Sequence, residues 1–600
     1  MKTIIQILPE QVANQIAAGE VIQRPASAVK EMLENAIDAG ADQITLLIND
    51  AGKELIQVID NGCGMNTFDA RMCFERHATS KIRKAEDLHS IHTMGFRGEA
   101  LASIASVAQV ELKTKLHDEE TGTQIIIEGG KVTSHEACST SSGSSLSVKN
   151  LFFNLPARRN FLKSNPVETR HIIEEYNRVA LAYPNVSFKL MINGTETSQV
   201  KAGNMRHRIC SLFGQAYDER LVPIDEDTRL IKISGYILKP EFARKTRGEQ
   251  YFFVNNRFIK DAYLNHAILT GYKDLLSQGS YPSYFIHLSI DPANIDVNIH
   301  PTKHEIKFID EKSIYAILRA AVKRSLGRFS VSPSLDFDVD PAIQIPLSKY
   351  KEKPVQPSIT VNKNYNPFAT SDLRKEKESP ESWDSFYKDL NRSTKTAVEV
   401  QQKVDVSIEE NIPLRAIGQY AGTYLIAQYG SNFIIGDQQM MHEKVLYESF
   451  LFHLEHQAAS SQQSLFPNTI QLNVKQAETF KEINPYLKQV GFDVQDFGKN
   501  TIAIHGLPSL ALNENSESLL LELIDDFEQS NIPNIQIKEK VARTLSKRFA
   551  LKRGKILEKV EIESLLNELM NSPSPAIHPS GKLCYKQMTS DQLFNWIQSK

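Results

Sequence analysis

The chain has 600 residues, which is too long for one ordinary core and predicts three or four domains. Its net charge of −3 excludes a globally basic nucleic-acid binder, so any DNA site has to be a local patch. Its five cysteines are odd in number and form no CxxC pair, which disfavours a disulfide scaffold or a thiolate zinc ribbon.

The start of the chain has no secretory pattern, because its short apolar run ends at Pro9. No stretch of the sequence approaches the roughly 20 apolar residues needed to span a bilayer. We therefore expect a cytoplasmic protein with no membrane partner, associated with the nucleoid if the source is a bacterium.

The first long element is a predicted helix at residues 26–39, where apolar side chains recur at helical spacing and Gly40 follows as a stop signal. Residues 44–50 and 55–62 then predict two strands, joined by a turn at 51–52. Helical and strand patterns continue to alternate up to about residue 330.

A later block predicts strands at 251–259 and 284–290 and closes with a helix at 313–326. From 331 to 413 the chain is rich in Pro, Ser, Lys, Glu and Asn, which predicts a flexible linker. Periodicity returns at about residue 414, where 423–437 predict a hairpin turned at Gly430 and Ser431.

Four segments carry the candidate chemistry, and the first is on the helix at 26–39. Glu31 and Asn35 are four residues apart and share one helix face. A carboxylate there can orient a water, and an amide oxygen one turn later can ligate Mg²⁺. Taken alone, the segment fits an exposed acidic helix face equally well.

The second segment is DNGCG, which follows a strand and includes Asp60, Gly62 and Gly64. The glycines allow a ligand to approach the backbone closely, and a carboxylate at a strand end can accept a hydrogen bond from an adenine amino group. The alternative is a plain hairpin turn, since Asp-Asn-Gly sequences are common in turns.

The third and fourth segments would handle phosphate. Glycines in TMGFRGEAL precede a predicted helix at 100–107, whose N-terminal N–H groups form a natural phosphate cradle. Two hundred residues later, DVNIHPTK places Lys303 beside a proline-anchored loop, from which it could reach a terminal phosphate. An ordinary helix cap and a solvated lysine are the plain alternatives.

The ordered set KEMLENAIDAGA, DNGCGM, RHATSKI, GFRGEAL, LFFNLPARRNFLK and DVNIHPTKHEIKF resembles the MutL mismatch-repair family of GHKL ATPases. The resemblance implies an α+β multidomain protein. Its parts are a GHKL (Bergerat) ATPase α/β sandwich at 1–216, a ribosomal-S5-like transducer domain at 217–330, a disordered linker at 331–413 and an α/β C-terminal dimerisation domain at 414–600.

The resemblance also implies ATP and Mg²⁺ as cofactors and assigns site residues. Glu31 corresponds to the general base, Asn35 to the Mg²⁺ ligand and Asp60 to the adenine-reading carboxylate. The remaining nucleotide contacts are Gly62 and Gly64 beside Asp60, Thr79, Ser80 and Lys81 in the lid, Gly95, Phe96, Arg97 and Gly98 in the phosphate loop, Ser144 where the family has threonine, and Lys303 as the γ-phosphate sensor.

The family further implies a homodimer that couples a MutS-type mismatch sensor to downstream effectors through slow ATP hydrolysis and clamping of double-stranded and single-stranded DNA. A helicase is a further implied partner. We place a local basic DNA-binding patch at Arg257 and Lys260, and regard Arg158 and Arg159 as mainly structural.

The C-terminal half contains a degenerate nuclease pattern. The segment from Asp437 to Glu448 resembles the family's endonuclease motif DQHAxxExxxxE and keeps Glu443, but Gln439 replaces the metal-binding histidine. His578 aligns with the second motif, where two further positions differ. Asp437, Glu443 and His578 remain candidate ligands of a weakened metal site. We predict dimerisation as the main role of this half, with a metal-dependent nicking endonuclease as the alternative.

A short QxxLF pattern formed by Gln462, Leu465 and Phe466 resembles a sliding-clamp-binding peptide. A buried strand start before Pro467 explains it equally well.

Two other GHKL classes fit less well. A histidine kinase should have a phospho-accepting helix before the ATP domain, yet the ATP helix already begins near residue 26. A type II topoisomerase requires a tyrosine-bearing cleavage region and does not carry LFFNLPARR.

Overall fold

The computed structural model describes residues 18–19, 21–82, 84, 94–95, 98–245, 247–273, 275–277, 279–296, 306–331, 414–456, 459, 461–498, 500–511, 515–529 and 536–598. Residues 332–413, which include nearly all of the predicted linker, lie outside these ranges. Within them, no helix is both long and apolar enough to cross a lipid bilayer.

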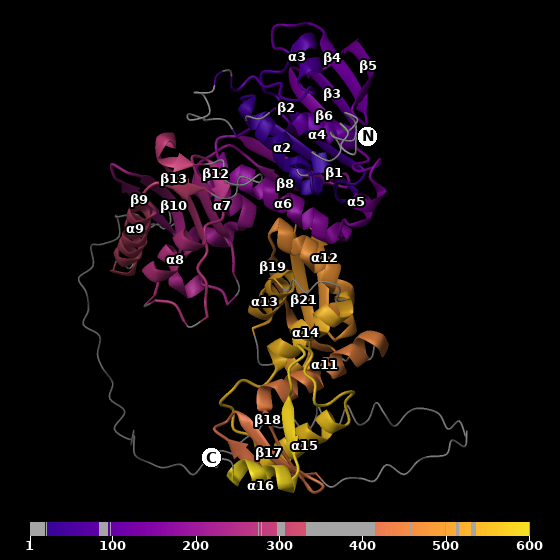
Figure 1. The fold of residues 1–600 in the computed structure, drawn as a ribbon, viewed down its shortest axis with the longest axis vertical. Helices are drawn as coiled ribbons and strands as arrows, with labels where there is room; N and C mark the ends of the chain where they lie inside the picture. Colours follow the sequence, from indigo (N-terminus) through magenta and orange to yellow (C-terminus); the bar gives the residue numbers. More distant parts are fainter. Residues whose placement is uncertain are drawn as a thin grey trace, which may run out of the picture. The chain divides into compact units, whose positions relative to one another are not determined.

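An eight-stranded sheet organises the first part of the chain (Figure 1). Its strands are β1 (Gln43–Asn49), β2 (Leu55–Asp60), β3 (Gln109–Lys115), β4 (Gly122–Glu128), β5 (Lys131–Cys138), β6 (Gly143–Lys149), β7 (Ser187–Ile192) and β8 (Thr195–Val200). They follow the spatial order β5-β4-β3-β6-β2-β1-β7-β8. Both β1 and β6 pair antiparallel with β2, and this register places Ser144 opposite Asp60.

The helices of this part are α2 (Pro25–Asp38), α3 (Thr67–Met72), α4 (Ala100–Val107), α5 (Pro156–Asn160), α6 (Asn165–Ala182) and α7 (Met205–Phe213). Pro25 suits the first turn of α2, because its missing N–H has no partner to lose there. Gly40 follows the helix end with a φ of 73°, in the left-handed region that glycine adopts at low cost. The predicted helix and its stop signal are confirmed.

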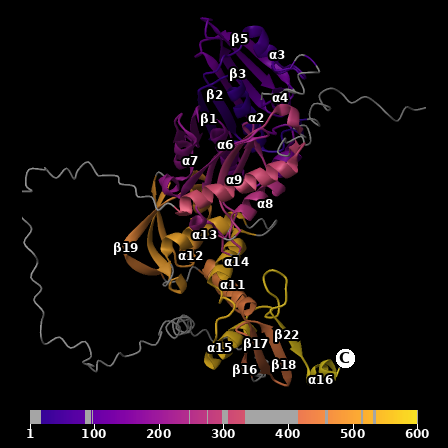
Figure 2. The ribbon, with the colours of Figure 1, turned by 90° about the vertical axis from the view of Figure 1, so that its left-hand side faces the viewer.

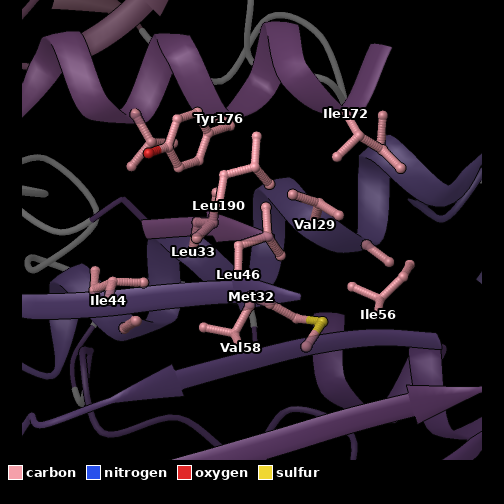
Figure 3. Close-up of a cluster of buried hydrophobic side chains, with 14 of the residues drawn as sticks. Val29, Met32, Leu33, Ile44, Leu46, Ile56, Val58, Ile172, Tyr176 and Leu190 are labelled. Atoms are coloured by element: carbon pink, nitrogen blue, oxygen red, sulfur yellow. The ribbon is translucent and has the colours of Figure 1, made fainter. Parts of the chain in front are cut away.

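Helix α2 buries one face between the sheet and α6. Figure 3 shows Leu33 of α2 close to Tyr176 of α6 and to Leu46 and Leu190 of the sheet, and all four side chains are at most 1% exposed. Truncating a fully buried leucine such as Leu33 to alanine would cost about 2–5 kcal/mol. The helix is therefore held firmly in both position and rotation.

A second sheet has the order β12-β11-β13-β10-β9. Its strands are β9 (Leu221–Asp227), β10 (Lys232–Leu238), β11 (Gln250–Val254), β12 (Arg257–Ile259) and β13 (Tyr284–Ser289). Helices α8 (Ala262–Gly271) and α9 (Glu311–Val331) lie side by side and pack on it (Figure 2). A short pair, β14 (Ile295–Asp296) and β15 (Lys307–Phe308), completes this part.

The prediction of one continuous strand at 251–259 is wrong. The chain reverses at Asn255 and Asn256, whose φ angles of 47° and 65° turn β11 into an antiparallel hairpin with β12. Two successive residues with positive φ define the turn that best matches strand twist, and asparagine tolerates that conformation. The Asn-Asn pair was the signal for this turn.

The C-terminal part contains a four-stranded sheet of order β16-β17-β18-β22 and a three-stranded sheet of order β19-β21-β20. The predicted hairpin at 423–437 is confirmed as β17 and β18. The bounds are β16 (Leu414–Tyr420), β17 (Tyr424–Tyr429), β18 (Asn432–Asp437), β19 (Ser461–Gln471), β20 (Asp493–Gly498), β21 (Thr501–Pro508), β22 (Tyr585–Met588), α11 (Gln438–His456), α12 (Val474–Gln489), α13 (Ser516–Gln529), α14 (Ile537–Phe549), α15 (Lys559–Met570) and α16 (Ser590–Gln598).

Short 3₁₀ turns join some of these elements, at Asp50–Gly52, Gln215–Arg220, Pro240–Phe242, Pro292–Asn294 and Ser509–Ala511.

Candidate functional site

The polar face of α2 contributes three side chains at helical spacing: Glu31, Asn35 and Asp38. The carboxylate of Glu31 is 19% exposed and lies 3.7 Å from the ammonium of Lys30, which is also 3.5 Å from the carboxylate of Glu34. Burial alone would lower the pKa of Lys30, but Glu34 and Glu31 outweigh it, so this pKa is raised. The lysine therefore stays charged beside the predicted base.

Asp60 stands at the end of β2 in a partly buried position. Burial raises the pKa of its carboxyl group to about 6, although hydrogen bonds from the backbone of Gly62 and Ser144 oppose the shift. The N–H of Gly62 donates to Oδ1 of Asp60 at 2.9 Å. A carboxylate fixed in this way at a strand end has the chemistry expected of an adenine-reading group.

The glycines beside Asp60 permit close backbone packing. A Cβ on Gly64 would lie 2.1 Å from the carbonyl oxygen of Lys115, and the φ of Gly64 is 71°. Ser144 follows Gly143 at the start of β6, and its hydroxyl oxygen is 3.0 Å from the hydroxyl oxygen of Thr114. Ser144 therefore keeps a hydroxyl at the position where the family has threonine.

The predicted lid and phosphate loop converge on the polar face of α2. The Nζ atom of Lys81 donates to Oδ1 of Asn35 at 3.2 Å and to Oδ2 of Asp38 at 2.5 Å. The N–H groups of Met94 and Gly95 donate to the Asp38 carboxylate at 3.0 and 3.2 Å. This cluster joins helix α2, the predicted lid and the predicted phosphate loop in one place.

Gly98 brings the phosphate loop against the lid. A Cβ on Gly98 would lie 2.4 Å from the carbonyl oxygen of Ala78, and the φ of Gly98 is 64°. Thr79 accepts a hydrogen bond from the N–H of Lys81 at 3.2 Å, whereas Ser80 is exposed. Phe96, Arg97 and Lys303 lie outside the described residues.

Two functional contacts were missed in the sequence. The first is Asp38, which could have been found because it continues the spacing of Glu31 and Asn35 by one further turn. The second is a hydrogen bond from Nη2 of Arg257 in β12 to the carbonyl oxygen of Met94, at 3.1 Å. We predicted Arg257 in a DNA-binding patch, but its guanidinium group faces the phosphate loop, while Lys260 is exposed.

The carboxylates of the degenerate nuclease motif are paired with cationic or potentially cationic side chains of the same chain. Asp437 is 2.9 Å from the guanidinium of Arg553, and Glu448 pairs with Lys444. Glu443 is 3.2 Å from Nε2 of His578.

No group of three or more His, Cys, Asp or Glu side chains within the described residues is placed to hold a metal ion. The nearby His442 is engaged in the fold, because its Nδ1 accepts a hydrogen bond from the backbone of Leu551 at 3.0 Å. Burial lowers the pKa of His442 to about 4, so it is neutral at physiological pH. The structure thus brings Glu443 and His578 together, and their role as metal ligands stays a prediction.

The QxxLF segment lies on β19, which bulges away from its partner strand β21 between Gln463 and Asn468. Gln462 is exposed and Phe466 is 82% exposed. The segment is part of a strand, as one reading expected, but Phe466 is not buried there.

Comparison with known proteins agrees with this arrangement. Residues 23–151 match the family model described as histidine kinase-, DNA gyrase B-, and HSP90-like ATPase. Residues 209–327 match the C-terminal domain model of DNA mismatch repair protein, and residues 417–557 match the MutL C terminal dimerisation domain. The ATPase fold implied by the resemblance is therefore confirmed.

Full-length relatives lead to the same family. The chain is 46% identical to DNA mismatch repair protein MutL of Christiangramia forsetii and 46% identical to that of Flavobacterium psychrophilum, with 99% of each chain covered in both comparisons. It is 42% identical to the MutL of Bacteroides fragilis, over 99% of this chain and 100% of the relative. The chain therefore belongs to the MutL family of DNA mismatch repair proteins.

Proposed function

We propose that this ATPase works as a nucleotide-driven switch in mismatch repair, in which slow Mg²⁺-dependent hydrolysis changes how the protein engages its partners. The observation that supports this most directly is the cluster at Asp38, where the helix of the predicted base meets the lid and the phosphate loop. A ligand that enters this cluster must act on all three segments at once.

The residues present fit a magnesium–nucleotide complex. Asn35 and Asp38 direct two oxygen atoms toward one point, marked by Nζ of Lys81, and Mg²⁺ prefers oxygen ligands. The missing side chain of Gly95 leaves room there, because a Cβ would lie 3.3 Å from that nitrogen. Asn35 would hold the metal, and the metal would neutralise phosphate charge.

The other roles follow from position. The Glu31 carboxylate would orient the attacking water and accept its proton, while Asp60 would read the adenine amino group. Thr79, Ser80 and Lys81 would close over the nucleotide, and Gly95, Phe96, Arg97 and Gly98 would supply phosphate contacts, together with Ser144 near the base. Lys303 would complete the site from the second domain.

Communication with the second domain is supported by the hydrogen bond from Arg257 to the carbonyl of Met94. Because β12 already touches the phosphate loop, a change in that loop on hydrolysis would be transmitted to the transducer sheet. This supports a switch in which nucleotide state controls the relation between the two domains.

The proposed partners follow from the family. We propose a homodimer held by the region 417–557, which engages a MutS-type sensor, double-stranded and single-stranded DNA and a helicase in the cytoplasm. Lys260 remains a candidate phosphate contact because it is exposed. Gln462, Leu465 and Phe466 would bind a sliding clamp, which the exposure of Phe466 supports. The domain boundaries at 216, 330 and 413 remain part of this proposal.

We propose that the C-terminal half does not cleave DNA. Gln439 and Ser580 stand where the family's motifs have metal-binding histidines, and an amide or a hydroxyl is a weaker ligand than an imidazole for a borderline metal. The carboxylates Asp437, Glu443 and Glu448 contact Arg553, His578 and Lys444 of the same chain. Dimerisation is then the main role of this half.

The experiment that tests the switch compares Glu31→Ala and Asn35→Ala with the unmodified chain. Glu31→Ala should bind ATP normally and lose hydrolysis, whereas Asn35→Ala should bind Mg²⁺–ATP weakly. Glu136→Ala, at an exposed position on β5, is the matched control and should hydrolyse ATP normally. Normal hydrolysis by Glu31→Ala would show that the base is assigned incorrectly.

A further inference from the structure

Lys81 occupies a distinctive position in the nucleotide site. Its ammonium group donates to Oδ1 of Asn35 at 3.2 Å and to Oδ2 of Asp38 at 2.5 Å. The side chains of Lys81 and Asp38 are only 18% and 7% exposed, so water screens the pair weakly. A cation of the chain itself therefore binds the oxygen assigned to the metal.

Asp38 connects this cation to the phosphate loop. Its second oxygen, Oδ1, accepts the N–H of Met94 at 3.0 Å, and Oδ2 accepts the N–H of Gly95 at 3.2 Å. One carboxylate thus fixes a lysine from the lid and two backbone donors from the loop. The N–H groups are satisfied by an anion of the chain, as they would be by a phosphate.

Metal and ammonium compete in this arrangement. Mg²⁺ binds oxygen ligands at about 2.0–2.1 Å, so it cannot share Oδ1 of Asn35 with an ammonium group that keeps its present place. Two positive charges at that separation would also repel each other strongly. Lys81 must leave Asn35 before the metal can bind there.

We propose that Lys81 and the Mg²⁺ ion compete for Oδ1 of Asn35, and that Asp38 is the positioning residue that anchors Lys81 and the phosphate loop. This inference rests on the proposed assignment of Asn35 as the Mg²⁺ ligand. Binding of the magnesium–nucleotide complex then exchanges one cation for another, and the displaced lysine releases the lid from α2. The exchange couples arrival of the metal to movement of the lid.

The test measures binding of a fluorescent ADP to the full-length protein as a function of free Mg²⁺, relative to binding of the same ADP without Mg²⁺, so that any direct contact of Lys81 with the nucleotide cancels. In Lys81→Met the midpoint should fall about tenfold, because one charge-assisted hydrogen bond no longer has to be broken and such a bond is worth roughly one decade. Lys131→Met removes the same charge at an exposed position on β5, outside the site, and it should leave the midpoint unchanged. A midpoint in Lys81→Met that stays unchanged or rises would overturn the inference.

Asn35→Ala separates this failure from failure of the proposed function. If nucleotide binding by Asn35→Ala keeps its normal dependence on Mg²⁺, the metal ligand itself is wrongly assigned. If that dependence is lost but Lys81→Met behaves like the unmodified chain, only the competition is wrong.

Hydrogen exchange provides a second readout for Asp38. In Asp38→Asn without nucleotide, the amides of Met94 and Gly95 should exchange faster than in the unmodified chain, since an amide oxygen is a weaker acceptor than a carboxylate. Unchanged exchange at both amides would remove Asp38 from the positioning role.

Discussion

Replacing Gly98 with alanine should damage nucleotide binding far more than it damages folding. The φ of Gly98 is 64°, and an added Cβ would lie 2.4 Å from the carbonyl oxygen of Ala78 in the lid. The left-handed conformation alone costs a residue with a side chain about 1–2 kcal/mol. The overlap adds a second cost, because the lid backbone must move away before the chain can fold around the methyl group.

Gly194→Ala is the matched control. Gly194 has a φ of 78° in the turn between β7 and β8, and an added Cβ would meet nothing within 4 Å. Gly194→Ala therefore has the free-energy cost of the left-handed backbone conformation without any steric overlap. Both variants should lose thermal stability from backbone strain, and Gly98→Ala should lose somewhat more because of the overlap with Ala78. The effect on nucleotide binding that is seen in Gly98→Ala alone reports on contact between loop and lid.

The assay is titration with ATP in the presence of Mg²⁺. If displacement of the lid weakens ATP binding by about 2 kcal/mol, the dissociation constant for ATP should rise roughly 30-fold in Gly98→Ala. The dissociation constant of Gly194→Ala for ATP should stay unchanged. Equal dissociation constants for the two variants would refute the reasoning, because the contact with Ala78 would then have no influence on the site.

Four further predictions concern other parts of the chain. Because an ionised carboxylate accepts the adenine amino group more strongly than a protonated carboxyl group does, nucleotide affinity should fall as pH drops through about 6, and Asp60→Asn should flatten this profile. The same raised pKa means that the folded state binds more protons than the unfolded state between the ordinary aspartate pKa of 3.8 and about 6. The contribution of Asp60 to stability should therefore increase as pH falls through that window, which thermal unfolding at several pH values would measure. With Mn²⁺ and supercoiled plasmid, the full-length protein should leave the plasmid intact, and nicking that disappears in Glu443→Ala would contradict the proposed role. Phe466→Ala should weaken binding to a bacterial sliding clamp by tenfold or more on the scale of interface hot spots, whereas Phe497→Ala, 76% exposed on β20, should not, as surface-immobilised clamp would show.

Local patterns predicted the elements that carry the site. The helix at 26–39, the strand predicted at 55–62, which ends at Asp60, and the hairpin at 423–437 were read correctly apart from their exact bounds. Each depends on periodicity or a turn signal within a few residues. The ordered motifs then indicated the family, which full-length comparison confirmed. The individual site roles, the domain boundaries and the clamp motif remain predictions.

Long-range contacts could not be predicted in the same way. Asp38 meets Met94 across 56 residues, and Arg257 meets the carbonyl of Met94 across 163. Nothing in the local sequence of Arg257 distinguishes a guanidinium that faces the phosphate loop from one that faces DNA. The pairing of Asp437 with Arg553, 116 residues apart, is of the same kind.

Helix α2 carries its core residues and its chemistry on opposite faces of one short cylinder. Val29, Met32, Leu33 and Ala36 are buried, while Glu31, Asn35 and Asp38 form the polar face. Because both faces belong to one helix, in which neighbouring positions differ by about 100° around the axis, a change in core packing that rotates the helix also changes the direction of the site side chains. Laboratory selection for heat resistance in this protein should therefore recover few changes at these core positions, and those it recovers should alter nucleotide turnover even though they never touch the nucleotide.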